Sequence, residues 1–241
     1  MTNALASQEF TRPRTTVQQV ARADFLRPMP SGAEADALES ELHWIGTSVA
    51  FGRGRRVAEQ GDGAEYISRV ETGALRVVHQ LSDGRRCIVR FLMAGDYFGL
   101  EEGGIYTSSV EAITDARVVR YRRTVLEQLC AHDPRVSRRF LTLVARQLSA
   151  VQDSLVLIGR KSAPERLASF LVAMAERSEQ EGSVALPMDR ADIADYLGLR
   201  IETVSRILTA LRRRKIVDLP NFHTFVILNR GALESMTEGD E

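Results

Sequence analysis

Three side chains near the C-terminal end of the chain combine a carboxylate, a hydroxyl and a guanidinium at helical spacing: Glu202, Ser205 and Arg206. Positions three and four residues apart lie on one face of a helix, and Thr209 continues that face. Arginine can donate two hydrogen bonds to O6 and N7 of guanine, glutamate can accept one from the N4 amine of cytosine, and serine can contact thymine. The set therefore predicts the reading of base edges in the major groove of DNA.

A local excess of positive charge surrounds this base-reading set. Residues 200–215 include six basic residues and one acid, although the whole chain balances 32 Lys and Arg against 32 Asp and Glu. Basic side chains neutralise DNA phosphates. The candidate contacts to the DNA backbone are Arg200, Thr203, Thr209, Arg212, Arg213, Arg214, Lys215 and His223. The alternative is an amphipathic helix whose charged face is only solvated.

Two predicted helices must position these side chains. Asp189 can cap a short helix over 190–197, and Asp192 adds negative charge in its first turn. Gly198 supplies the turn into a second helix over 201–214. The second helix turns an apolar face inward, formed by Val204, Ile207, Leu208 and Leu211. This arrangement predicts a helix-turn-helix with the base-reading set pointing outward.

A β-hairpin follows the second helix. Residues 216–219 and 224–228 are two short strand-like runs around a turn at 220–223. Two helices and a hairpin predict a winged helix-turn-helix over 161–241. His223 would then lie near the wing tip and the DNA backbone, or would be an exposed loop histidine without a role.

A long amphipathic helix is predicted upstream, over 134–158. Apolar residues recur at alternating steps of three and four, at Leu141, Val144, Leu148, Val151, Leu155 and Ile158. This narrow stripe is typical of a coiled coil, so we expect residues 133–160 to form a dimerisation helix. An ordinary helix packed on its own β domain is the alternative. Gly159 should close the helix, and Ser162 and Glu165 have capping-box spacing for the next one.

The region before the long helix has the sequence pattern of a β domain. Short β-type runs between Ile45 and Tyr121 alternate with glycines, and 82–85 reads as a hairpin turn. Many short, closely spaced strands predict a sandwich, barrel or jelly roll. We assign 36–132 to this domain and 1–35 to a flexible N-terminal arm, giving an α+β chain.

Four motifs resemble the CRP/FNR superfamily of bacterial regulators: Gly73–Val77, Gly95–Gly99, Asp189–Gly198 and Ile201–Arg206. The resemblance runs from about residue 40 onward. It implies an N-terminal β-roll, which is a cyclic-nucleotide-binding-like jelly roll, then a long dimerisation helix and a C-terminal winged helix-turn-helix. It also implies a homodimer that binds double-stranded DNA and contacts RNA polymerase.

Within the superfamily, the details favour its FixK-type members. The cAMP-dependent branch carries arginine at the position of Ile201 and glycine at that of Ser205, and the base-reading set resembles readers of inverted TTGA repeats. The runs His132–Arg138 and Ile193–Leu199 also resemble FixK-type regulators. The resemblance implies an activator of genes for low-oxygen respiration or nitrogen fixation. A ligand-gated regulator of the same fold, with an unidentified effector in the β-roll, is the alternative.

Sensor chemistry is not expected in the β-roll. Cyclic-nucleotide-binding relatives use an arginine to hold the phosphate, but no arginine occurs between Asp96 and Ala116, and Glu101 and Glu102 would repel an anion. An iron–sulfur cluster needs four thiolates, and the chain has two cysteines. Haem is not expected either, although three histidines could ligate iron: His43, His79 and His132.

The cysteine content and the motifs that the sequence lacks restrict the compartment and the class of protein that we expect. We interpret Cys87 and Cys130 as buried, inert thiols of a protein in a reducing compartment, with redox sensing as the alternative. No stretch approaches the roughly 20 apolar residues of a membrane span, and we see no secretory signal. No nucleophile elbow, phosphate loop or zinc signature suggests an enzyme. We therefore expect a cytoplasmic, non-enzymatic, metal-free protein.

Overall fold

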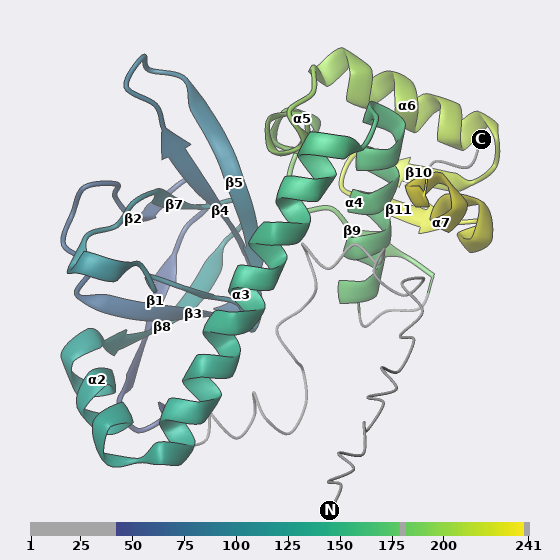
Figure 1. Cartoon of the computed structure of the whole chain (residues 1–241). Helices are drawn as coiled ribbons and strands as arrows, with labels where there is room; N and C mark the ends of the chain where they lie inside the picture. The colour runs from purple at the N-terminus through teal and green to yellow at the C-terminus, as the bar shows by residue number, and fades with distance from the viewer. Residues whose placement is uncertain (1–41, 179–181, 239–241) are drawn as a thin grey trace, which may run out of the picture.

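The structure, a computed structural model, describes residues 42–178 and 182–238. The predicted N-terminal arm and the first residues of the predicted β domain lie outside the described residues. Figure 1 shows three parts along the described chain: a sheet-rich domain, one long helix beside it, and a mainly helical domain at the far end of that helix. The predicted α+β class and order of parts are confirmed.

The sheet-rich domain is a β-roll of two four-stranded sheets, ordered β1-β8-β3-β6 and β2-β7-β4-β5. The strands are β1 (Gly46–Phe51), β2 (Arg56–Ala58), β3 (Tyr66–Thr72), β4 (Ala74–Gln80), β5 (Arg86–Met93), β6 (Tyr97–Phe98), β7 (Ser109–Ala112) and β8 (Ala116–Arg122). All pairings are antiparallel. The predicted hairpin at 82–85 joins β4 to β5.

The sheets face each other across an apolar core. Alternate residues of the strands point inward, and Val70, Leu75, Leu92 and Val118 are completely buried there. Gly73 makes the corner between β3 and β4 with a φ of +84°, and a Cβ at this position would lie 2.3 Å from the Asp115 carbonyl oxygen. Only glycine fits both the conformation and the close approach.

Two helices follow the β-roll, α2 (Arg123–His132) and α3 (Pro134–Arg160). The Asp133 side chain caps α3 by accepting a hydrogen bond from the backbone N–H of Arg135 at 2.9 Å. The predicted helix is confirmed, and it runs past Gly159, where the sequence predicted its end. One face of α3 packs on the β-roll through Val136 and Leu143.

The C-terminal domain is a winged helix-turn-helix. Its elements are α4 (Ala163–Arg177), β9 (Val184–Ala185), α5 (Arg190–Leu197), α6 (Ile201–Arg213), β10 (Val217–Asn221), β11 (Thr224–Ile227) and α7 (Arg230–Glu238). The predicted helices and hairpin are confirmed. Strand β9 completes a sheet ordered β10-β11-β9, and neither β9 nor α7 was predicted.

The winged helix packs directly on the β-roll. Phe91 of β5 lies 5.2 Å from the Tyr196 ring of α5 and 6.2 Å from the Phe170 ring of α4, measured between ring centroids. These three rings belong to one hydrophobic cluster that also includes Ala74 and Val78 of β4. The two domains therefore share a core, a contact that periodicity could not predict because it joins distant segments.

Candidate nucleic-acid interface

The base-reading set is positioned by the turn between α5 and α6. Asp189 caps α5 by accepting from the backbone N–H of Asp192 at 2.8 Å. Gly198 ends α5 in the left-handed conformation, with a φ of +63°. Helix α6 then buries Val204 and Leu208 against the domain core. Its opposite face is left to solvent.

The three predicted base readers lie on that outer face, but they are not equivalent. Glu202 and Arg206 are exposed, and the Arg206 Nη2 lies 3.5 Å from the Thr203 hydroxyl. Ser205 is half-buried, and its hydroxyl accepts a hydrogen bond from Arg190 Nη1 at 3.3 Å. Thus α6 presents one acidic and one basic side chain, Glu202 and Arg206, with the short Ser205 side chain between them.

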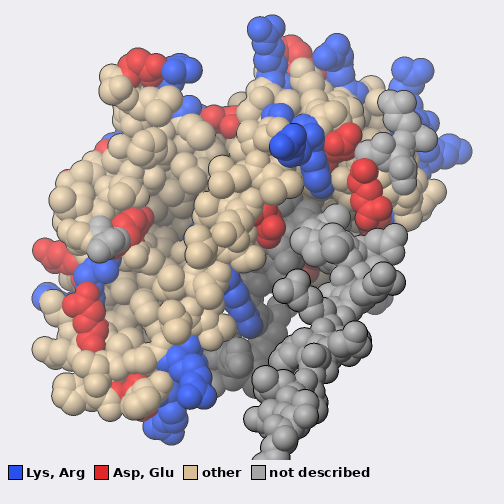
Figure 2. Space-filling model, viewed as in Figure 1, with Lys and Arg blue, Asp and Glu red and all other residues tan. Residues whose placement is uncertain are grey.

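The predicted contacts to the DNA backbone divide into two groups. Arg200, Arg213, Arg214 and Lys215 are exposed at the two ends of α6. Three more have intramolecular partners: Thr203 accepts from Arg206, the Thr209 hydroxyl donates to the Ser205 carbonyl at 2.8 Å, and Arg212 pairs with Asp218 at 3.5 Å. Figure 2 shows Lys and Arg side chains standing out over the end of the molecule that contains α6 in Figure 1.

Sequence reasoning missed two residues in this region, Phe222 at the wing tip and Arg190 at the start of α5. The Phe222 side chain is 74% exposed, and the Arg190 guanidinium lies 5.3 Å from the centre of its ring. His223 is exposed, and its Nδ1 lies 3.2 Å from the carbonyl oxygen of Leu186. Arg190 therefore links the wing to Ser205 on α6. The sequence carries no local signal for this role, because both contacts of Arg190 depend on the wing and α6 folding back on α5.

The proposed dimer seam is a stripe of exposed apolar side chains on α3. Each predicted member is at least 40% exposed: Leu141, Val144, Leu148, Val151, Leu155 and Ile158. The surface over α3 in Figure 2 carries few charges. By length and composition α3 could also cross a membrane, with a mean hydropathy of 1.2 in its most apolar window, contrary to the sequence-based expectation. Alternation with Arg146 and Gln152 makes it amphipathic instead.

A cavity of about 670 Å³ lies between the β-roll, α3 and α5. Its wall includes Arg90, Glu101, Ser108 and Tyr196. The Arg90 guanidinium donates to the Tyr97 carbonyl at 2.7 Å, whereas Glu101 Oε2 is buried without a hydrogen-bond partner among the described residues. A carboxylate oxygen in that position repels an anion. The wall of the cavity thus carries a positive group, Arg90, and a negative group, Glu101.

The two cysteines are less buried than predicted. Cys87 is exposed on β5 and Cys130 is half-buried on α2, so the expectation of two buried thiols was wrong. Alternation along β5 puts Cys87 on its outer face. Burial nevertheless raises the pKa of both thiols, and Asp195 raises that of Cys87 further. Within residues 42–178 and 182–238, no three His, Cys, Asp or Glu side chains cluster in a way that could hold a metal ion.

A β-roll, a long apolar helix and a winged helix with an exposed basic reading face define a DNA-binding regulator. Residues 165–236 match the Crp-like helix-turn-helix domain, and residues 48–133 match the cyclic nucleotide-binding domain.

Similar proteins show which type of regulator this chain is. The nitrogen fixation regulation protein FixK of Rhizobium meliloti is 40% identical over 86% of this chain and 99% of its own. FixK of Azorhizobium caulinodans is 38% identical over 80% of this chain and 79% of its own. The structure of FixK2 from Bradyrhizobium japonicum, 38% identical, covers 82% of this chain and 100% of its own with a TM-score of 0.78. The chain belongs to the CRP/FNR family of transcription regulators, as a FixK-type member.

Proposed function

We propose that two copies of this chain pair along α3 and bind an inverted TTGA-type repeat in double-stranded DNA. One observation carries the proposal: α6 exposes Glu202 and Arg206 on one face, with the short Ser205 between them. In a dimer, the two α6 helices would enter successive major grooves roughly 34 Å apart. Each would read one half-site.

Roles within a half-site follow from donor and acceptor chemistry. Arg206 donates two hydrogen bonds to a guanine, and Glu202 accepts from a cytosine amine. The exposed Arg200, Arg213, Arg214 and Lys215 contact phosphates. We add Arg190 to this group, because its guanidinium lies at the junction of α5, α6 and the wing.

The test of this assignment compares Arg206→Ala with Arg213→Ala, both of which remove one exposed arginine from α6. Arg206→Ala should cost about 1–3 kcal/mol per half-site and relax specificity at one base pair. Arg213→Ala should weaken binding evenly on all sequences and reduce the salt slope by about one. Fluorescence anisotropy with single-base variants of the operator measures both. An even loss with Arg206→Ala would reassign that residue to phosphate.

Control of this regulator does not require cAMP. The unpartnered Glu101 oxygen in the cavity argues against a cyclic phosphate, and we expect no iron–sulfur cluster, haem or metal. Isothermal titration calorimetry with cAMP should give no heat of binding in the micromolar range. On this proposal the protein binds DNA as made, and control acts on its synthesis or turnover.

A second candidate is a ligand-gated regulator, favoured by the size of the same cavity. A volume of about 670 Å³ lies within the roughly 300–1,000 Å³ typical of small-molecule sites. The wall is mainly apolar, which would suit an apolar effector. Native mass spectrometry of freshly purified protein distinguishes the candidates, because a retained effector adds a discrete mass.

The cellular role that we propose follows the named relatives. FixK of Rhizobium meliloti and of Azorhizobium caulinodans are nitrogen fixation regulation proteins. We propose that this chain acts in the cytoplasm, without enzymatic activity, and activates genes for low-oxygen respiration or nitrogen fixation by contacting RNA polymerase. The exposed turn at 83–85 is one surface available for that contact.

A further inference from the structure

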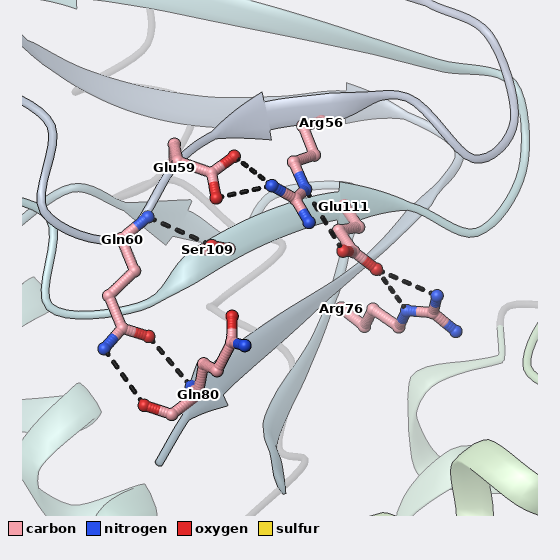
Figure 3. Close-up of polar contacts among 7 residues, drawn as sticks. All are labelled: Arg56, Glu59, Gln60, Arg76, Gln80, Ser109 and Glu111. Carbon is pink, nitrogen blue, oxygen red and sulfur yellow. Dashed lines mark hydrogen bonds and ion pairs between the residues drawn. The ribbon is translucent and has the colours of Figure 1, made fainter. Parts of the chain in front are cut away.

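A line of alternating charges crosses the β-roll and ends inside the winged helix. Glu59 accepts two hydrogen bonds from Arg56 at 2.5 Å, and Arg56 lies 3.6 Å from Glu111. Glu111 in turn accepts from Arg76 Nε and Nη2 at 3.0 and 2.8 Å. Figure 3 shows these four side chains following one another across β2, β7 and β4.

Arg76 carries this line across the domain boundary. Its Nη1 donates to Asp192 Oδ1 at 2.6 Å, so one guanidinium bonds Glu111 of β7 and Asp192 of α5 together. Only 4% of the Asp192 side chain is exposed. A buried carboxylate needs a partner, and Arg76 supplies it from the other domain. Asp192, first expected only to favour the start of α5, therefore has a second role.

Two further ion pairs join the same surfaces. Arg177 of α4 pairs with Asp96 of the β-roll at 2.8 Å, and both side chains are less than 10% exposed. Arg86 of β5 lies 3.8 Å from Asp195 of α5. Because these contacts involve α4 and α5, a rotation of the winged helix as one body relative to the β-roll must break them.

Different contacts hold the two domains together and fix the angle between them. The Phe91, Phe170 and Tyr196 rings provide apolar contact, which is not directional. A guanidinium bonded to two carboxylates has a fixed geometry, because its donors form a rigid planar fork. Buried ion pairs add little net stability compared with apolar packing. The Arg76–Asp192 pair is therefore better suited to fixing an angle than to holding the domains together.

We propose that Arg76 is a positioning residue for DNA binding, which holds α5, and through it α6, at the angle that matches the operator without any bound effector. This inference rests on the proposed function. Glu111 and Arg56 orient the Arg76 side chain, and Asp192 receives it. In a ligand-gated regulator the bound ligand would fix the angle of the winged helix, and here the Arg76–Asp192 pair fixes it.

The experiment measures binding of full-length dimers to two duplexes, an inverted TTGA repeat of natural spacing and the same repeat with one base pair added between the half-sites. Arg76→Met keeps an apolar stem, and Asp192→Asn keeps the shape and one acceptor oxygen. Arg117→Met is the matched control, because Arg117 pairs with Glu71 at 3.7 Å and both residues belong to the β-roll. Thermal unfolding verifies that each variant is folded.

Both interface variants should bind the natural repeat about tenfold more weakly and discriminate less between the two spacings. The double variant should bind no more weakly than Arg76→Met, since the contact between Arg76 and Asp192 is already lost in that single variant. Arg117→Met, which loses the same charge as Arg76→Met, should keep the spacing preference. Asp192→Asn tests the proposal even if Arg76→Met does not fold. Losing a negative charge should by itself strengthen DNA binding, so weaker binding by Asp192→Asn cannot be an effect of charge.

Opposite results overturn the inference. Tighter binding by Asp192→Asn with unchanged spacing preference would mean that the pair either restrains the protein in an inactive arrangement or has no positioning role. Failure of the proposed function is a separate result, since the unaltered protein would then show no preference for the TTGA repeat over a scrambled duplex.

Discussion

Individual side chains on α6 were predictable because their chemistry and spacing are both local properties. Glu202, Ser205 and Arg206 share a face in any helix that covers them, and the outward direction followed from the apolar residues opposite. The bond from Arg190 to Ser205 and the stacking of Arg190 on Phe222 were not predictable. They require the wing to fold back on α5, and single-residue chemistry does not encode that path.

The reactivity of Cys87 and Cys130 depends on the immediate surroundings of each thiol. Burial raises the pKa of Cys87 and Cys130, so less thiolate is present at neutral pH than in a free cysteine. Iodoacetamide should therefore alkylate both thiols more slowly than free cysteine at pH 7, and the rates should rise through a higher pH range. Mass spectrometry of quenched samples gives the two rates. A faster rate for Cys87 than for free cysteine would instead favour a redox-sensing thiol.

Helices and strands were predictable where periodicity and capping agreed. The limits of α5 follow from Asp189 at its start and Gly198 at its end. The two-residue strand β9 has too little sequence for a period, and it exists because β11 offers it a partner. The burial of Asp192 was missed for the same reason, since its partner lies on β4.

The apolar seam of α3 should tolerate no charge if it forms the dimer interface. Leu148→Glu places a carboxylate at a seam position that is 59% exposed in the single chain. Burial of a leucine from each chain contributes about 3 kcal/mol or more, and dimerisation should weaken roughly 100-fold. Sedimentation equilibrium measures this constant. Gln152→Glu adds the same charge beside the seam and should leave the dimer intact.

Equal loss of dimer with Leu148→Glu and Gln152→Glu would mean that charge on α3, rather than the seam, sets association. An unaffected dimer with Leu148→Glu would move the interface to another surface. The stripe would then need the alternative explanation, a helix whose apolar face serves its own β domain and the cavity beside it.

At the scale of the whole molecule, the domains form one body with a shared core. The β-roll, α3 and the winged helix were each predictable as separate patterns. Their mutual arrangement was not, because Phe91 and Tyr196, or Arg76 and Asp192, are far apart in sequence and carry no common period. The arrangement matters for function, since it sets the direction in which α6 faces DNA.

The most direct test is fluorescence anisotropy of aerobically purified, ligand-free protein with an inverted TTGA duplex at a stated salt concentration. A scrambled duplex and a TGTGA duplex serve as competitors. A dimer should bind the TTGA repeat at least about 10³-fold more tightly than the scrambled duplex. Weak or unselective binding would contradict binding in the absence of an effector and would show that the domains need an effector or modification to bring α6 into position.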